Sequence, residues 1–194
     1  MTQAPIDDHA LLSDQRTCAL VSRRGDIDWL CMPRFDSTAI MASILGDDSH
    51  GHWSLRLTEG EVTSRRYDEG TMVLRTEWIT PTGRARVTDF MPAPEGDNEA
   101  DLAHDFADLA DLVRHVECLE GEVEVSGELS LRFDYGRIRP FSSTGVDVLG
   151  QPVVVDVAGA DAVALHGPGL SPEGERHRIE HRLQAGESTF WSLT

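Results

Sequence analysis

The sequence predicts a mainly β protein, an antiparallel β-sandwich with one short helix near residues 38–45. Most apolar residues alternate with polar ones over short runs, which is the period of a strand with one buried face. Glycine, proline and aspartate separate these runs at regular intervals, as in all-β domains. Helical spacing with capping residues at both ends occurs near residues 38–45.

A hairpin and the predicted helix open the chain. Residues 17–22 and 27–31 are predicted strands, and Gly25 supplies the permissive backbone of the turn between them. Pro33 must lie outside the sheet because proline cannot donate to a ladder. Asp36 or Ser37 then caps the helix, which ends at Gly46. Its apolar side consists of Ile40, Met41, Ile44 and Leu45.

The rest of the chain alternates with strand periodicity. Residues 52–57 form a predicted strand, and residues 71–80 pair with residues 84–91 in a second hairpin. Residues 95–111 are an acidic insertion, interpreted as a short helix or a mobile loop. The later predicted strands are 112–119, 122–135 with a bend near Ser126 and Gly127, 146–149, 153–157, 163–165, 177–183 and 189–193.

Length and composition limit the class of protein. A chain of 194 residues fits a single domain, residues 1–194, with a proper core. Its net charge of −17 opposes binding to nucleic acid or to an anionic membrane. The N-terminal residues lack the features of a secretory signal, so we expect a cytoplasmic protein. Cys18, Cys31 and Cys118 lie in strand patterns and are predicted to be buried free thiols.

Several ordered segments resemble one known family. They are DQRT (14–17), ALVS (19–22), GDIDWLC (25–31), PRFDS (33–37), DFMP (89–92), LVRHVE (112–117), GEV (121–123) and RFDYGR (132–137). Together they resemble the trehalase-like N-terminal domain that precedes the catalytic barrel in glycoside hydrolase family 15, a family of glucoamylases, glucodextranases and trehalases. The segments extend over most of the chain, although the connection at residues 95–111 is longer than is usual in the family.

The resemblance implies a fold, a role and a partner. The fold is a large two-sheet β-sandwich of the supersandwich type. The role is that of a non-catalytic domain that packs on and shapes an α/α barrel of the same polypeptide, which hydrolyses α-glucosides. The sequence contains no amphipathic helical series that could form this barrel, so we expect the catalytic carboxylates to lie elsewhere and the chain alone not to be an enzyme. Whether the substrate is trehalose, a maltooligosaccharide or a dextran stays open.

The residues themselves offer no convincing catalytic or cofactor site. Glycoside hydrolysis needs two facing carboxyl groups, and 34 acids supply candidate pairs by chance alone. Asp28, Asp36 and Asp89 lie in the most specific segments, where hydrogen-bonding or capping roles are expected. The cluster Asp47, Asp48, His50 and His52 is interpreted as a solvated turn rather than a metal site. No phosphate-binding loop or dinucleotide motif is present, so no cofactor is predicted.

The candidate functional segment is the loop at residues 29–36. In one interpretation Trp29 belongs to the core and Arg34 pairs with Asp36 to brace the loop. In the other, Trp29, Pro33, Arg34, Phe35 and Asp36 form an interface with the barrel or the rim of its sugar pocket, because Trp, Arg and Phe dominate binding hot spots. An uncovered interface would favour self-association of the isolated domain.

A carbohydrate-binding module is the alternative function. β-Sandwiches of this class present aromatic side chains to sugars, and Trp29, Trp53, Trp78 and Trp191 are the available tryptophans. A coplanar exposed pair of aromatic rings would favour such a module, whereas buried rings would favour the structural role.

Overall fold

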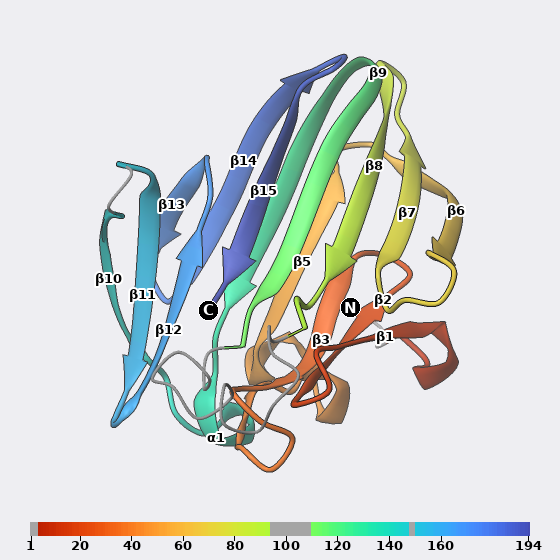
Figure 1. The fold of residues 1–194 in the computed structure, drawn as a ribbon. Coiled ribbons are helices and arrows are strands. Elements are labelled where there is room, and N and C mark those ends of the chain that lie inside the picture. Colours follow the sequence, from red (N-terminus) through yellow and green to blue (C-terminus); the bar gives the residue numbers. More distant parts are fainter. Residues whose placement is uncertain (1–3, 94–109, 148–149) are drawn as a thin grey trace.

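The computed structural model describes residues 4–93, 110–147 and 150–194, and it confirms a mainly β, antiparallel fold (Figure 1). All named strands belong to a single hydrogen-bonded network. The long strand β9 (Leu112–Ser130) is its centre, because four other strands pair with it. The predicted insertion at residues 95–111 lies outside the described residues except for Ala110 and Asp111.

The pairing divides into two groups at β9. Residues 122–130 of β9 pair with β5 and β14, whereas residues 112–121 pair with β8 and β15. We call the group around β5 the β5 layer and the group around β8 the β8 layer. The β5 layer contains β1 (His9–Ser13), β2 (Cys18–Ser22), β3 (Asp26–Cys31), β4 (Ala39–Met41), β5 (His52–Leu57), β13 (Leu170–Glu173) and β14 (Arg176–Gln184). The β8 layer contains β6 (Glu61–Tyr67), β7 (Leu74–Ile79), β8 (Gly83–Phe90), β10 (Phe141–Val146), β11 (Pro152–Ala158), β12 (Asp161–His166) and β15 (Ser188–Leu193).

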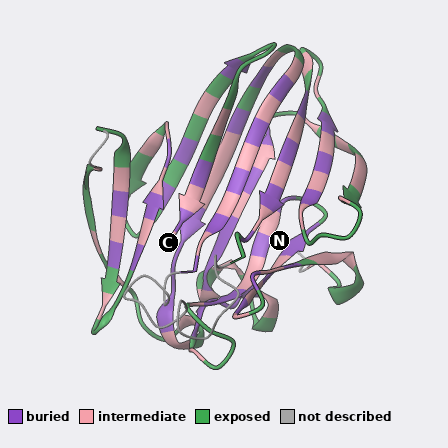
Figure 2. Cartoon of the chain, viewed as in Figure 1, coloured by how far each residue is buried: buried purple, intermediate pink, exposed green. Residues whose placement is uncertain are grey.

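A shared core joins the two layers. Buried residues alternate with more exposed ones along the central strands, as Figure 2 shows. Trp53 and Leu55 of β5 belong to the same buried cluster as Val87 of β8 and Trp191 of β15. The alternation predicted for residues 52–57 and 71–80 is therefore the pattern that buries one side of each strand.

The predicted helix at residues 38–45 is wrong. The segment forms β4, which pairs with β3, and a single 3₁₀ turn, η2 (Ser43–Leu45). Three consecutive residues of β4 are buried, so both faces of this strand are covered and its sequence does not alternate. Successive apolar residues can belong either to such a strand or to a helix, and here the contact with β3 decides.

The remaining helical segments are short. They are η1 (Ile6–Asp8), η3 (Asp48–His50) and α1 (Phe133–Gly136), whose residues Asp134 and Tyr135 have left-handed backbone angles. None of the helical segments in the described residues has the length and hydrophobicity that crossing a bilayer requires.

Two further predictions need correction. They are the break between residues 119 and 122 and the bend at Ser126 and Gly127. The two predicted strands form the single strand β9, which ends at Ser130, and its pairing with β5 and β14 runs through Gly127 without a register shift. The buried positions change parity at Gly121 instead, where φ is +69° and β9 passes from one layer to the other. A side chain at Gly127 would meet the Ser54 carbonyl at 2.4 Å, so the close approach of β5 explains this glycine.

Candidate functional site

Arg34 and Asp36 pair with each other in the predicted interface loop. Arg34 Nε donates to Asp36 Oδ1 at 2.9 Å and its Nη2 donates to Oδ2 at 3.0 Å, and both side chains are exposed. The hydrogen bonds from Arg34 lower the pKa of Asp36 below its ordinary value. Ser37 Oγ accepts from the Arg34 amide at 3.2 Å, so this segment is a turn and not the cap of a helix.

The other predicted residues of the loop point to different environments. Pro33, which follows a cis peptide bond, lines a cavity of about 190 Å³ together with Phe133 and Thr194. Phe35 is 58% exposed, while its amide donates to the Arg16 carbonyl at 2.8 Å. Trp29 is half-buried, and its ring lies 6.1 Å from that of Tyr135 at an angle of 43°.

Exposed apolar side chains accompany Phe35 in neighbouring turns. Leu45 of η2 is 65% exposed, Tyr135 of α1 is 41% exposed and Ile138 is 47% exposed. The turns of Leu45 and Tyr135 are linked, since η3 packs on both η2 and α1 (lower part of Figure 1). The loop that carries Phe35 adjoins α1 through the Trp29–Tyr135 ring contact and through the cavity that Pro33 and Phe133 line. We call Phe35, Leu45, Tyr135 and Ile138 the apolar end of the domain.

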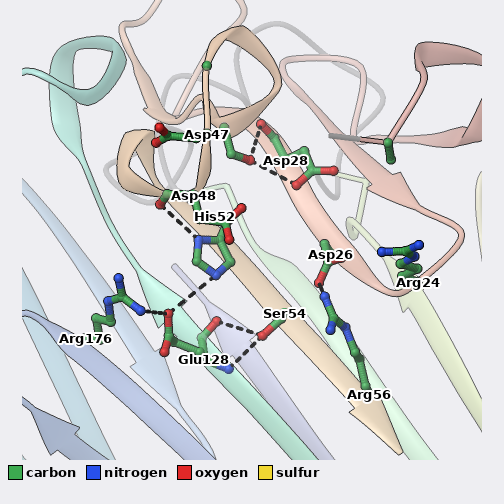
Figure 3. Close-up of a pocket in the computed structure, with 13 residues that line it drawn as sticks. Arg24, Asp26, Asp28, Asp47, Asp48, His52, Ser54, Arg56, Glu128 and Arg176 are labelled. Carbon is green, nitrogen blue, oxygen red and sulfur yellow. Dashed lines mark hydrogen bonds and ion pairs between the residues drawn. The ribbon is translucent and has the colours of Figure 1, made fainter. Parts of the chain in front are cut away.

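A second candidate is a polar pocket of about 250 Å³ on the outer side of the β5 layer (Figure 3). Asp26 and Asp28 of β3, Ser54 and Arg56 of β5 and Glu128 of β9 point into it. They occupy the alternate positions to the buried Ile27, Trp53, Leu55 and Leu129, which is why they face outward.

Several charged groups of this pocket have partners that hold them in place. Glu128 Oε1 accepts from Arg176 Nη1 at 2.8 Å and lies 3.6 Å from His52 Nε2. Asp26 pairs with Arg56, and Asp28 accepts from Ser43 Oγ at 2.9 Å. The pocket therefore offers a polar ligand a set of donors and acceptors that the protein itself orients.

Sequence reasoning missed this pocket because its residues come from separate strands. Asp28 was singled out for a hydrogen-bonding role, which fits its contacts with Ser43 and with His9 Nε2 at 2.7 Å. The polar residues at alternate positions of β3 and β5 were a usable signal, but the sequence does not show that these strands are neighbours.

Asp89, the third acid singled out, is a buried residue of β8. Its Oδ1 accepts from Arg114 Nε at 2.9 Å, and both side chains are inaccessible to solvent. Arg114 also donates to the carbonyl oxygens of Trp53 at 3.1 Å and Gly25 at 2.8 Å, and its guanidinium lies 5.2 Å from the centre of the Trp53 ring. Asp89 thus has the structural role predicted for it, with a partner that the sequence did not identify.

Asp47, Asp48 and His50 form the predicted turn, whereas His52 is the buried first residue of β5. Asp47 caps η3 by accepting from the Ser49 amide at 2.8 Å, and hydrogen bonds from Ser49 lower the pKa of Asp47. His52 Nδ1 lies 3.2 Å from the Asp48 carbonyl oxygen. Within the described residues, no group of three or more His, Cys, Asp or Glu side chains is arranged to hold a metal ion.

Comparison with known sequences establishes the family. The family described as "Trehalase-like, N-terminal" matches residues 1–185, which is nearly the whole chain. The chain belongs to this trehalase-like N-terminal family. The resemblance of the short motifs to a trehalase-like N-terminal domain is thereby confirmed.

The curated relatives that the chain matches are much longer proteins. A trehalase of Mycobacterium tuberculosis is 30% identical over 202 residues, which cover 98% of this chain and 30% of that protein. A trehalase of Mycolicibacterium smegmatis is 30% identical over 210 residues, with the same coverage of 98% and 30%. An archaeal trehalase, from Thermoplasma volcanium, is 30% identical over 136 residues, or 68% of this chain and 20% of that protein. The chain thus spans about 30% of the length of the first two relatives.

Proposed function

We propose that this trehalase-like N-terminal domain is a non-catalytic scaffold that packs on the α/α-barrel domain of a glycoside hydrolase of family 15 and shapes its access to α-glucosides. The observation that carries the proposal is the apolar end. Phe35, Leu45, Tyr135 and Ile138 expose large apolar groups on turns that adjoin α1 or η3, and clusters of exposed apolar groups mark interaction surfaces.

The position of Thr194 supports the same partner. Thr194 lines the cavity that Pro33 also lines, so a chain continuing from Thr194 in a longer protein would leave the sandwich beside the interface loop. The Arg34–Asp36 pair holds the loop that presents Phe35, and each residue of the pair also keeps exposed polar atoms for a partner.

A carbohydrate-binding module is the second candidate, favoured by the polar pocket of the β5 layer. Its oriented carboxylates, guanidinium groups and hydroxyls suit the hydroxyls of a sugar. The aromatic side chains favour the scaffold, because Trp53, Trp78 and Trp191 are buried and the Trp29–Tyr135 pair is tilted by 43° rather than coplanar.

Two measurements test the proposal. The purified chain is first incubated with trehalose, maltose and starch oligosaccharides, and we expect no glucose release; hydrolysis would contradict the non-catalytic role. NMR titration with the same sugars then tests the alternative, because shifts of the Asp28 and Ser54 amides would show that the polar pocket binds sugar.

A chimera tests the docking surface. This chain replaces the corresponding N-terminal region of the Mycolicibacterium smegmatis trehalase, and the variant Phe35→Asp is compared with Phe190→Asp, which changes an exposed phenylalanine on β15. We expect Phe35→Asp alone to lower the melting temperature and trehalase activity of the chimera. Equal behaviour of both variants would refute docking through the apolar end.

A further inference from the structure

The edges of the sheets are protected unequally. Five strands in the described part of the chain have a single partner, namely β1, β4, β6, β10 and β13. Such strands carry main-chain groups that can pair with another chain, and proteins protect them with charges, proline or a covering segment. Among the residues that the structure describes, four of these strands have such protection and β10 has none.

Side chains of β6 cover the free edge of β1. The Tyr67 hydroxyl of β6 accepts from the Leu11 amide of β1 at 2.8 Å and donates to the Leu11 carbonyl at 2.9 Å. Arg65 of β6 donates to the Asp8 carbonyl at 2.9 Å. The three residues of β4 are buried, and β13 contains Pro172 and Glu173 in its four residues.

β10 (Phe141–Val146) has the opposite character. Its sequence FSSTGV contains neither a charge nor a proline, in a chain whose net charge is −17. Phe141 is 80% exposed and Val146 is 70% exposed, and β10 forms the outer edge of the β8 layer (left in Figure 1).

The register of β10 against β11 shows which main-chain groups face outward. The Asp147 amide donates to the Gln151 carbonyl at 2.9 Å, and these residues continue the pairing of Phe141 with Val157. Because hydrogen-bonded pairs alternate in an antiparallel ladder, Ser143 and Gly145 also face β11. Ser142, Thr144 and Val146 then direct their N–H and C=O groups away from the sheet.

We propose that two copies of this chain pair through β10, antiparallel and about a two-fold axis at Thr144. This register places Ser142 of one copy opposite Val146 of the other, so that all three outward-facing residues form hydrogen-bonded pairs. A shift that centres the axis on Ser143 would place Pro140 opposite Val146 and lose a donor.

Charge complementarity favours a second copy as the occupant. Arg139, which also pairs with Glu175 at 2.7 Å, precedes β10, and Asp147, which also accepts from the Gln151 amide at 2.8 Å, follows it. Antiparallel pairing therefore brings the positively charged end of each β10 near the negatively charged end of the other. Between them lie only uncharged residues, so the strands meet without repulsion. One strand pair buries far less than a standard interface of about 1,600 Å², so we expect a weak dimer with a Kd between about 10 µM and 1 mM.

The test is sedimentation velocity of the 194-residue chain across that concentration range, with Thr144→Pro and Thr144→Ala as matched variants. Proline removes an N–H that β11 does not use, so the monomer fold is retained while the Kd rises at least about tenfold. Alanine keeps the N–H and should dimerise like the unsubstituted chain. Circular dichroism verifies that both variants are folded.

Three results would overturn the proposal. They are a chain that stays monomeric at 1 mM, a Thr144→Pro variant that dimerises as the unsubstituted chain does, and a dimer that Phe35→Asp dissociates. The last result would instead assign self-association to the apolar end, and would leave the proposed function intact.

Discussion

Arg114 makes the contacts that tie the two layers together. It stands on β9 in the part that pairs with β8, yet it donates to carbonyl oxygens of the β5 layer, at Trp53 and Gly25, while Asp89 neutralises its charge. A buried guanidinium is expensive to desolvate, and here its carboxylate and carbonyl partners compensate for that cost.

Removing this side chain should therefore destabilise the domain strongly. We expect Arg114→Ala to lower the free energy of unfolding by about 3–5 kcal/mol, because Asp89 is left buried without a partner. The control is Arg86→Ala, whose half-exposed partners Glu77 and Glu117 lie at 3.4 Å, and it should cost at most about 1 kcal/mol. Urea denaturation measures both; similar losses would mean that the Arg114 contacts contribute little.

The contact between Arg34 and Asp36 should make the stability of the domain depend on pH. Hydrogen bonds from Arg34 lower the pKa of Asp36, so the pair favours folding above the unfolded-state pKa of Asp36, and this contribution disappears as the pH falls through the folded-state value. Arg34→Ala should return the pKa of Asp36 to its ordinary value. NMR titration of the Asp36 carboxyl group measures it, and an unchanged pKa would contradict the bracing contact.

The same substitution should scarcely alter the stability of the isolated domain. Both side chains are exposed, and exposed pairs contribute little to folding. A large loss of stability on Arg34→Ala would favour bracing as the main role of this residue over docking.

At the scale of elements, the first hairpin was predicted correctly because its turn chemistry is local. Gly25 has φ of +84° between β2 and β3, as a tight turn requires. Close packing adds a second constraint, since a Cβ at Gly25 would lie 2.4 Å from the Leu55 carbonyl oxygen.

Comparison of two glycines separates these constraints. Gly70 has a similar φ of +73° but open space where its Cβ would lie, so Gly70→Ala should cost about 1 kcal/mol from backbone strain alone. Gly25→Ala should cost at least about 1–2 kcal/mol more, because β5 must also move. Thermal denaturation of both variants measures the difference, and equal losses would show that the β5 contact adjusts freely.

For the whole molecule, β9 makes separate unfolding of the two layers unfavourable. Its halves pair with different layers, and the buried cluster contains residues of both. We therefore expect a single cooperative transition in which tryptophan fluorescence and far-ultraviolet circular dichroism give the same midpoint in urea. Two separate midpoints would show that the layers unfold independently.

The family assignment and the antiparallel β class could be obtained from the sequence because both depend on local information. Strand periodicity, turn residues and short ordered motifs are all visible along the chain, and the hairpins at β2–β3 and β7–β8 were found in this way. The strands β1, β6, β10 and β13 were missed, and the strand predicted at residues 146–149 shares only Val146 with β10. Partly exposed or short strands carry little apolar alternation.

Tertiary structure decided the features that depend on which strands are neighbours. Ala39–Met41 is a strand because β3 lies beside it. Arg114 meets Asp89 because β8 pairs with β9, and it reaches the carbonyl oxygens of Trp53 and Gly25 only when the two layers pack together. The polar pocket and the unprotected edge at β10 likewise arise from sheet order, which side-chain periodicity does not encode. The sequence by itself determined the class, the family and the exposed loop at Phe35, because hydrophobic pattern and turn chemistry act over a few residues, whereas contacts between distant residues exist only in the folded chain.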